Sequence, residues 1–211
     1  MPRHFASVDW SKLKLPVFRW LWPVCRLSGA LVLLTLVCAC GEQSSQPRLA
    51  EGEEFPQITL NKLSGGTVSI SAFRGKLLVL NVWSTQCIPC REEMPDLERL
   101  SKTLDPQRFV VIGLSVQNDA YQVRKFLEYN GITFENFFDR DEVTLKQLDI
   151  TVYPVTLLIA PDGILIQRVM GRQEWSSPAV TKVLEDMYHG RSSRIGGWWY
   201  GGHSPSGIMV V

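Results

Sequence analysis

Two cysteines separated by two residues, Cys87 and Cys90, have the types and spacing best suited to chemistry in this sequence. They stand between an apolar run, Leu77–Trp83, and a segment in which Met94 and Leu97 belong to a helical repeat of apolar residues. We therefore expect both thiols at the first turn of a helix that follows a buried strand. Backbone N–H groups and the helix dipole favour an anion at that end, which lowers the pKa of a thiol. Cys87 is thus the predicted attacking thiolate, and Cys90, one turn further in, is the predicted resolving thiol.

Two other uses of a Cys-x-x-Cys pair compete with redox chemistry. A zinc site needs two more thiolate or imidazole ligands, but the domain around the pair offers no further cysteine and only His189 near its end. A purely structural disulfide is also open, although closing so short a loop contributes little stability in the chain-entropy model. We favour redox activity of the Cys87–Cys90 disulfide, with no metal and no other cofactor.

The elements that must position the pair alternate between strand and helix. Two nearly unbroken apolar runs, Leu77–Trp83 and Phe109–Ser115, predict central strands buried on both faces. Helices are predicted after Cys87, with a kink at Pro95, and over 118–130, 139–149 and 178–189. Gly-containing turns predict hairpins over 55–60 with 67–70 and over 155–160 with 164–169. This order predicts an α/β domain with parallel strands and right-handed crossovers.

Length and charge narrow the function classes. The chain has 211 residues, enough for one well-buried domain with extensions, and a formal net charge of +1 from 22 basic and 21 acidic residues. So balanced a charge gives no field of the kind that nucleic-acid binding requires. We therefore expect a single domain and no nucleic-acid partner.

The amino-terminal region has the pattern of an export signal. A segment with several basic residues, 1–26, precedes a charge-free apolar run over 27–40, which is shorter than the ~20 residues that a membrane span needs. The run ends in Leu-Val-Cys-Ala-Cys-Gly, which resembles the lipobox of bacterial lipoproteins, so Cys40 is the predicted lipidation site. An uncleaved membrane anchor and a cleaved soluble form stay open, and Cys25 and Cys38 are interpreted as small apolar residues. Each outcome places the rest of the chain outside the cytoplasm, on the periplasmic side, and the first two attach it to a membrane.

Composition also sets the expected boundaries. Residues 41–52 lack apolar periodicity and predict a flexible tether between the signal or anchor, 1–40, and a folded domain over 53–189. Residues 190–211, which are rich in Gly and aromatic residues, predict a disordered or loosely docked tail.

The segment Asn-Val-Trp-Ser-Thr-Gln-Cys-Ile-Pro-Cys-Arg-Glu-Glu-Met-Pro, residues 81–95, resembles the active-site segment of the thioredoxin superfamily. It is most similar to the membrane-anchored branch with the TlpA, ResA and CcmG-type thiol-disulfide oxidoreductases. Residues 152–156, Val-Tyr-Pro-Val-Thr, resemble the segment in which the superfamily keeps a cis-proline opposite the dithiol. The resemblance implies a thioredoxin-like three-layer fold with a central mixed sheet, an amino-terminal β-hairpin extension and a helical insertion around 120–149.

The resemblance also implies roles for single residues. Cys87 resembles the nucleophile, Cys90 the resolving cysteine, Pro154 the cis-proline and Trp83 the tryptophan that packs behind the dithiol. Because proline has no N–H, Pro154 leaves neighbouring backbone groups free to pair with an extended substrate. The positions expected to contact or place a substrate are Trp83, Gln86, Ile88, Pro89 and Tyr153.

Three positions carry the distinctive features of this site. Gln86 stands where the family usually has a second tryptophan, which diminishes the apolar docking platform. Asn81 stands where thioredoxin keeps a buried aspartate, and an amide cannot take over proton transfer from that acid. Glu93 matches an acidic residue of the anchored reductases and is the candidate for tuning Cys90, with a solvated helix glutamate as the alternative.

These features favour a reductant. Oxidising members place a histidine between the cysteines, where it stabilises the thiolate, and Ile88-Pro89 supplies no such donor. The resemblance implies disulfide-containing clients, among them apocytochrome c before haem attachment or a copper-site protein, and electrons from a DsbD- or CcdA-type transporter in the membrane. A thiol peroxidase and a dithiol chaperone for Cu(I) are the alternative functions.

Overall fold

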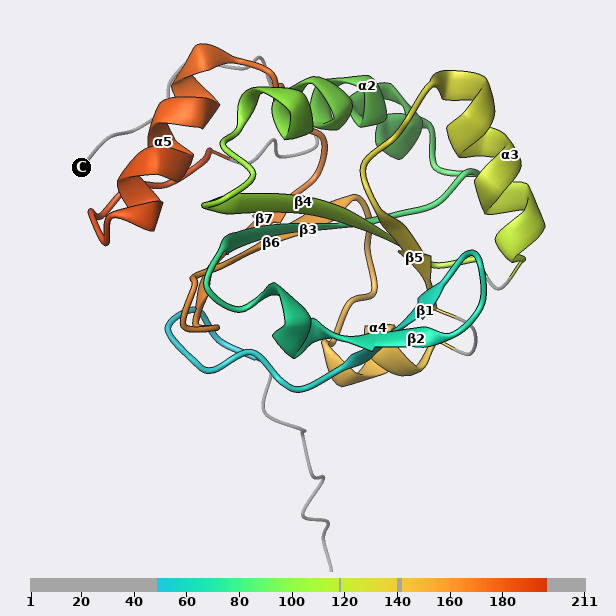
Figure 1. Cartoon of the computed structure of the whole chain (residues 1–211), viewed down its shortest axis with the longest axis horizontal. Coiled ribbons are helices and arrows are strands. Elements are labelled where there is room, and N and C mark those ends of the chain that lie inside the picture. Colours follow the sequence, from blue (N-terminus) through green and yellow to red (C-terminus); the bar gives the residue numbers. More distant parts are fainter. Residues whose placement is uncertain (1–48, 118, 140–141, 197–211) are drawn as a thin grey trace, which may run out of the picture. The chain divides into compact units, whose positions relative to one another are not determined.

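The structure, a computed structural model, describes residues 49–117, 119–139 and 142–196 (Figure 1). Its centre is a seven-stranded sheet in the order β2-β1-β5-β4-β3-β6-β7. The strands are β1 Thr59–Lys62, β2 Thr67–Ser69, β3 Leu77–Trp83, β4 Phe109–Ser115, β5 Asn136–Phe138, β6 Val155–Ile159 and β7 Leu165–Met170. β3, β4 and β5 run parallel, and the remaining pairs are antiparallel. The predicted α/β fold with a mixed central sheet is therefore confirmed.

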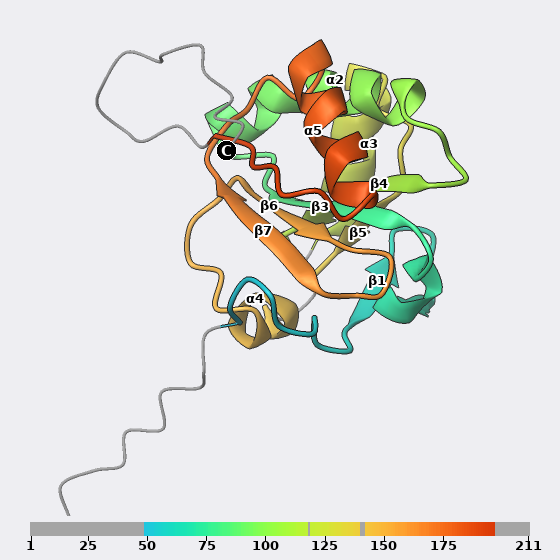
Figure 2. The same cartoon turned by 90° about the vertical axis from the view of Figure 1, so that its left-hand side faces the viewer.

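Helices cover both faces of the sheet. Figures 1 and 2 show α2 and α5 on one side and the short α4 on the other. The helices are α2 Ile88–Thr103, α3 Ala120–Asn130, α4 Val143–Gln147 and α5 Pro178–Tyr188, with a 3₁₀ turn over Ile70–Phe73. Each face of the sheet buries its own apolar cluster, one with side chains of α2, α3 and α5 and the other with side chains of α4 and the 3₁₀ turn. This is the three-layer arrangement that the family resemblance implies.

Strand β3 leads directly into the cysteine segment, and every one of its residues is buried, so the start of that segment is fixed in the core. Side chains alternate between the two faces of a strand. Leu77, Val79 and Trp83 accordingly join the cluster beneath α2, and the other three apolar residues of the strand, Leu78, Leu80 and Val82, join the opposite cluster. Asn81 shares the alternation of the α2 side. One polar amide is thus placed inside an otherwise apolar stripe, directly under the helix that carries the cysteines.

Local signals set the helix ends. Asp119 caps α3 by accepting from the N–H groups of Tyr121 and Gln122, and Gly131 ends it with φ of 65°. Ser177 caps α5 and Pro178 takes the first helical position, as predicted. Pro95 lies inside α2 without ending it.

Several boundaries differ from the predictions. The helix expected over 139–149 is limited to Val143–Gln147 among the described residues, and β5 before it was not predicted. The first hairpin strand is Thr59–Lys62, later than the expected 55–60. These elements have five residues or fewer, too short for a periodic pattern to define.

The folded part is also longer than the predicted 53–189. The Gly52 N–H donates to the Leu165 carbonyl, so the end of the predicted tether is docked. Ile195 is buried, and its backbone N–H and carbonyl both pair with the Gln167 side chain on β7. The first residues of the predicted loose tail therefore belong to the domain, whereas 197–211 lie outside the described residues.

Candidate functional site

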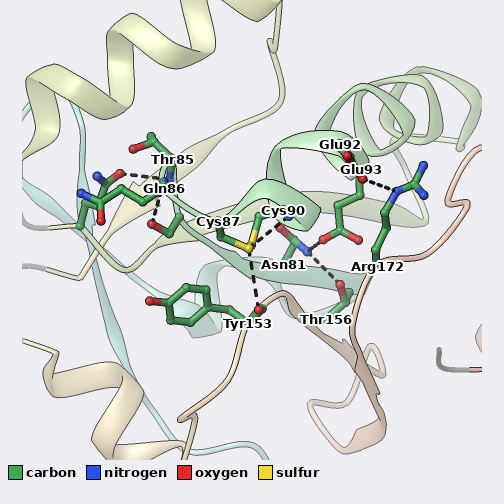
Figure 3. Close-up of a disulfide and its surroundings, with 12 residues drawn as sticks. Asn81, Thr85, Gln86, Cys87, Cys90, Glu92, Glu93, Tyr153, Thr156 and Arg172 are labelled. Atoms are coloured by element: carbon green, nitrogen blue, oxygen red, sulfur yellow. Dashed lines mark hydrogen bonds and ion pairs between the residues drawn. A yellow bond between two sulfur atoms is a disulfide. The ribbon is translucent and has the colours of Figure 1, made fainter. Parts of the chain in front are cut away.

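Cys87 and Cys90 form a disulfide at the amino-terminal end of α2 (Figure 3). Their Cα atoms are 5.3 Å apart. Cys87 is the N-cap residue, and its Sγ accepts from the Cys90 N–H at 3.2 Å. Cys87 is half-buried, whereas Cys90 is fully buried. Access and the donors of a helix start thus both favour Cys87 as the sulfur that meets another molecule, as the spacing predicts.

The segment before β6 faces the accessible sulfur. The Tyr153–Pro154 peptide bond is cis, as expected. The carbonyl oxygen of Tyr153 lies 3.8 Å from Cys87 Sγ. Val152 and Ile88 are exposed on the same segment and on the first turn of α2, at 59% and 65% of their surface. A polypeptide that approaches Cys87 therefore meets a backbone carbonyl and a small apolar rim.

The remaining predicted contact residues lie around the first cysteine. Gln86 is exposed and Pro89 is half-buried, both beside Cys87 in the chain. The Gln86 N–H donates to Ser84 Oγ at 3.2 Å, which holds the turn between β3 and α2. Their substrate-positioning roles stay predictions.

Trp83 lies behind the pair, in the same apolar cluster as Cys90. Its indole N–H donates to Oδ1 of Asn136 at 3.0 Å, and its ring lies 5.1 Å from that of Phe126. Gly113 on β4 leaves room for this contact, because a Cβ there would stand 2.0 Å from Asn136 Oδ1. Strand β5, which supplies Asn136, therefore contributes to the support of the site.

Glu93 is fully buried beneath the disulfide, so the solvated-glutamate alternative is wrong. Its Oε1 accepts from Asn81 Nδ2 at 2.8 Å, and its Oε2 accepts from the Gln173 N–H at 3.2 Å and from Trp175 Nε1 at 3.1 Å. Asn81 Nδ2 also donates to Thr156 Oγ1 at 3.0 Å. Figure 3 shows the Asn81 and Glu93 side chains pointing toward each other beside the disulfide.

Burial dominates the ionisation of this carboxyl. It raises the pKa of Glu93 to about 7, against the opposing effect of the three hydrogen bonds and of the Arg172 charge. Glu93 and Cys90 are three residues apart on α2 and thus share one helix face. A carboxyl that titrates near neutral pH next to a buried thiol is able to accept or return a proton there.

Sequence reasoning missed three of the partners of this network. Gln173 and Trp175 lie in the connection between β7 and α5, about eighty residues from Glu93, and no motif marks them. Thr156 belongs to the segment that resembles the cis-proline motif, but its pairing with Asn81 depends on the antiparallel register of β3 and β6. Long-range contacts of this kind leave no local pattern.

Other predicted features fall elsewhere. Cys25, Cys38 and the predicted lipidation site Cys40 lie outside the described residues. Within 49–117, 119–139 and 142–196, no helix combines the length and apolar character that crossing a membrane requires. In the same ranges, His, Cys, Asp and Glu side chains form no group of three or more that suits a metal ion.

Comparisons with known proteins add independent findings. The family model described as AhpC/TSA family matches residues 52–168. The chain is 31% identical over 146 residues to the thiol-disulfide oxidoreductase ResA of Geobacillus kaustophilus, covering 66% of this chain and 84% of that protein. It is 29% identical over 146 residues to ResA of Bacillus subtilis, with coverages of 66% and 82%. A solved thiol:disulfide interchange protein from Bacteroides sp. matches with a TM-score of 0.59 and 25% identity, over 68% of this chain and 95% of that one.

Proposed function

Because the chain belongs to the AhpC/TSA family and is a thioredoxin-like thiol-disulfide oxidoreductase of the ResA type, we propose that it reduces disulfides of client proteins outside the cytoplasm. One observation carries the proposal. A half-buried Cys87 and a fully buried Cys90 stand at a helix start, opposite the carbonyl of Tyr153. This arrangement presents one sulfur to a client and shields the other.

The reaction begins from the dithiol. The Cys87 thiolate attacks one sulfur of a client disulfide, the client disulfide breaks, and its other sulfur leaves as a thiolate that takes up a proton. The Cys90 thiol then gives its proton to the Glu93 carboxylate, and the resulting thiolate attacks Cys87 Sγ. The Cys87–Cys90 bond forms and the second client sulfur leaves as a thiolate, which also takes up a proton. The client gains two electrons and two protons, and the enzyme ends in the disulfide state.

The reducing direction is supported by what lies between the cysteines. The side chains of Ile88 and Pro89 have no hydrogen-bond donor, and Pro89 also lacks a backbone N–H, so neither side chain stabilises the Cys87 thiolate. Potentials across the superfamily span ~150 mV, which makes the direction measurable. A redox titration of the pair against glutathione and dithiothreitol buffers should give a potential near the reducing end. A potential close to that of the strong oxidants would overturn the direction.

Trapping the intermediate tests the chemistry and identifies the client. A Cys90→Ala variant cannot resolve the mixed disulfide and should retain clients on Cys87 in cells, to be identified by mass spectrometry. The matched control is Cys87→Ala with Cys90→Ala, which has no thiol in the described domain. Adducts that appear with both variants, or with neither, would contradict the proposal.

The proposal also covers where the protein is located and which proteins it exchanges electrons with. The apolar run over 27–40 and the lipobox-like sequence before Gly41 support export with Cys40 as a lipidated residue. On the outer side of a membrane, the reductase would need electrons from a DsbD- or CcdA-type transporter, and apocytochrome c is one expected client. Cys40→Ser should move the protein from the membrane fraction to the soluble fraction without changing the potential of the purified domain. A protein that stays in the membrane fraction would favour an uncleaved anchor.

A thiol peroxidase is the second candidate, because the AhpC/TSA family model matches most of the domain and the layout resembles that of peroxiredoxins. In that reaction a thiolate attacks a peroxide oxygen and becomes a sulfenic acid, which a second thiol converts to a disulfide with loss of water. Reduced protein mixed with hydrogen peroxide distinguishes the candidates. The reductase predicts negligible peroxide consumption and rapid reduction of insulin disulfides.

A further inference from the structure

The connection between β7 and α5 encloses the buried carboxylate of Glu93. We propose that Trp175 is a positioning residue of the dithiol chemistry, whose indole N–H fixes Oε2 of Glu93 and so holds this carboxyl in its place beneath Cys90. The proposal rests on the role given to Glu93 above. It extends that role to a side chain that lies beyond the matched family model, which ends at residue 168.

Trp175 does more here than fill space. Its ring is fully buried in the cluster that contains Cys90 and Met94. Its Nε1 donates to Glu93 Oε2 at 3.1 Å, and the Gln173 N–H donates to the same oxygen at 3.2 Å. A buried indole N–H without an acceptor is unfavourable, and so is a buried carboxylate without donors. The indole N–H therefore needs Glu93 as its acceptor, and Glu93 receives from it one of its three donors.

The two carboxylate oxygens have separate partners. Oε2 is held by the β7–α5 connection, whereas Oε1 is paired with Asn81 Nδ2 on β3. The connection is itself attached to α2, because Ser176 Oγ donates to Asp96 Oδ1 at 2.8 Å. Trp175 thus acts through Glu93, to which its one polar group is bonded.

The charged and polar groups around Glu93 come from every element packed on it. Arg172, on the same connection as Trp175, lies 3.7 Å from Glu92 of α2, with both side chains about half exposed. Its charge lowers the pKa of Glu93, as do the hydrogen bonds from Asn81 and Trp175. Thr156 and Cys90 are the neutral neighbours from β6 and α2, and Asp96 lies one turn beyond on α2.

Removal of the indole donor should raise the pKa of Glu93 and slow the resolution step. Trp175→Phe keeps most of the ring volume and takes away one hydrogen bond that favours the ionised carboxyl. The pKa of Glu93 should therefore rise by about one pH unit. Resolution of the mixed disulfide by Cys90, which needs the ionised carboxyl as proton acceptor, should slow up to about tenfold at pH 6 to 7 and recover at higher pH.

The first test follows a spectroscopic signal of the wild-type chain, with Glu93→Gln as its control. Nuclear magnetic resonance should show the Trp175 indole proton shifting with pH in step with the Glu93 carboxyl carbon, and this titration should disappear in Glu93→Gln. An indole proton that ignores the carboxyl would overturn the proposal, whatever the variants do. Because this readout does not use activity, it separates the proposal from the proposed reductase function.

The second test compares variants of the full chain. Trp175→Phe should raise the Glu93 midpoint and move the pH profile of mixed-disulfide resolution by the same amount, with no further effect in a Glu93→Gln background. Ser176→Ala is the control, since it loosens the same connection but removes no donor to Glu93. An equal shift in Ser176→Ala, or a Trp175→Phe effect that persists without Glu93, would show a structural role only. If the carboxyl midpoint moves but the rate profile stays, the role of Glu93 is wrong and the contact with Trp175 stands.

Discussion

Asn81 Nδ2 lies 2.8 Å from Glu93 Oε1, and neither side chain reaches solvent. The contact joins the central strand β3 to the helix that carries the cysteines. It brings the only amide of that strand and an acidic group of α2 together under the disulfide. If Glu93 has the role proposed above, the charge state of this one carboxyl links the stability of the fold to the chemistry of the dithiol, and the predictions begin with it.

Replacement of Glu93 by glutamine should remove a pH dependence of stability. Burial raises the pKa of Glu93 from its ordinary value of 4.5 to about 7, so the folded state binds the proton more tightly than the unfolded chain does. The contribution of Glu93 to the free energy of unfolding is fully present below pH 4.5 and is lost as the pH rises to 7. The loss amounts to ~3 kcal/mol. We expect urea unfolding of the oxidised proteins to show that the difference in free energy of unfolding between Glu93→Gln and wild type shifts by roughly that amount in favour of the variant between pH 4.5 and 7.5.

The comparison with wild type isolates this effect. Hydrogen bonds outweigh burial at Glu98 and Asp186 and lower the pKa of each carboxyl in the fold. Their contributions to the free energy of unfolding therefore increase with pH, but they are the same in both proteins and cancel in the comparison. Glu135→Gln, at an exposed position, is the control and should follow wild type across the range. A constant difference between Glu93→Gln and wild type would contradict burial as the cause.

Asn81→Asp should make the site more sensitive to alkaline pH. The new oxygen would face Glu93 Oε1 at the present donor distance of 2.8 Å. Two carboxylates so close cannot both ionise easily, so they share a proton and titrate as a pair. The folded state then holds protons that the unfolded chain releases, and stability falls by roughly 2 kcal/mol or more beyond wild type between pH 5 and 9. Unfolding at several pH values measures this, with the exposed Asn130→Asp as the control expected to show no such loss.

How far sequence alone reaches is visible in β3 and α2. The unbroken apolar run predicts a strand buried on both faces, and the structure buries all of it, including Asn81. The two motifs, 81–95 and 152–156, indicate that their segments meet, and Cys87 does lie beside Tyr153. The side chains that pack on the site could not be predicted in this way. Trp175 contacts the carboxyl of Glu93, 82 positions away, only because strand β7 carries the chain back to the site. A periodic pattern spans only a few turns or one strand, so it contains no information on such a contact.

At the carboxyl end, a segment that was predicted to be loose is docked on the domain. Residues 190–196 belong to the segment 190–211 that is predicted to be a disordered or loosely docked tail, and they contain only one large apolar residue. That residue, Ile195, is nevertheless buried, and Gln167 on β7 satisfies both of its backbone groups. A single anchoring side chain is enough to dock a short segment, but it carries no periodicity from which docking could be predicted.

Gly113→Ala should disturb the support behind the dithiol. A Cβ at this position would stand 2.0 Å from Asn136 Oδ1 and 2.9 Å from Trp83 Nε1, which are themselves hydrogen-bonded. The added methyl group has to displace that pair within a close-packed layer, at a cost of about 3 kcal/mol. Thermal unfolding should show the loss, and tryptophan fluorescence should report a changed environment of Trp83.

A second substitution checks the cause. Asn136→Ala in the Gly113→Ala background removes the atom in closest conflict, so the double variant should lose less stability than the two single losses added together. Simple additivity would mean that Gly113 matters for a different reason.

Ile195→Ala should destabilise the domain although the position lies beyond its last helix. The side chain is 3% exposed and packs in the cluster beneath α2 and α5. Truncation of a buried isoleucine removes its transfer free energy and leaves a cavity, which together cost about 2 to 4 kcal/mol. The nearby Ser192→Ala, at an exposed position, is the control and should stay within ~0.5 kcal/mol of wild type. Urea unfolding of the oxidised proteins measures both. Equal stability of Ile195→Ala and wild type would return this segment to the loose tail that its composition predicts, and the domain would then end at α5.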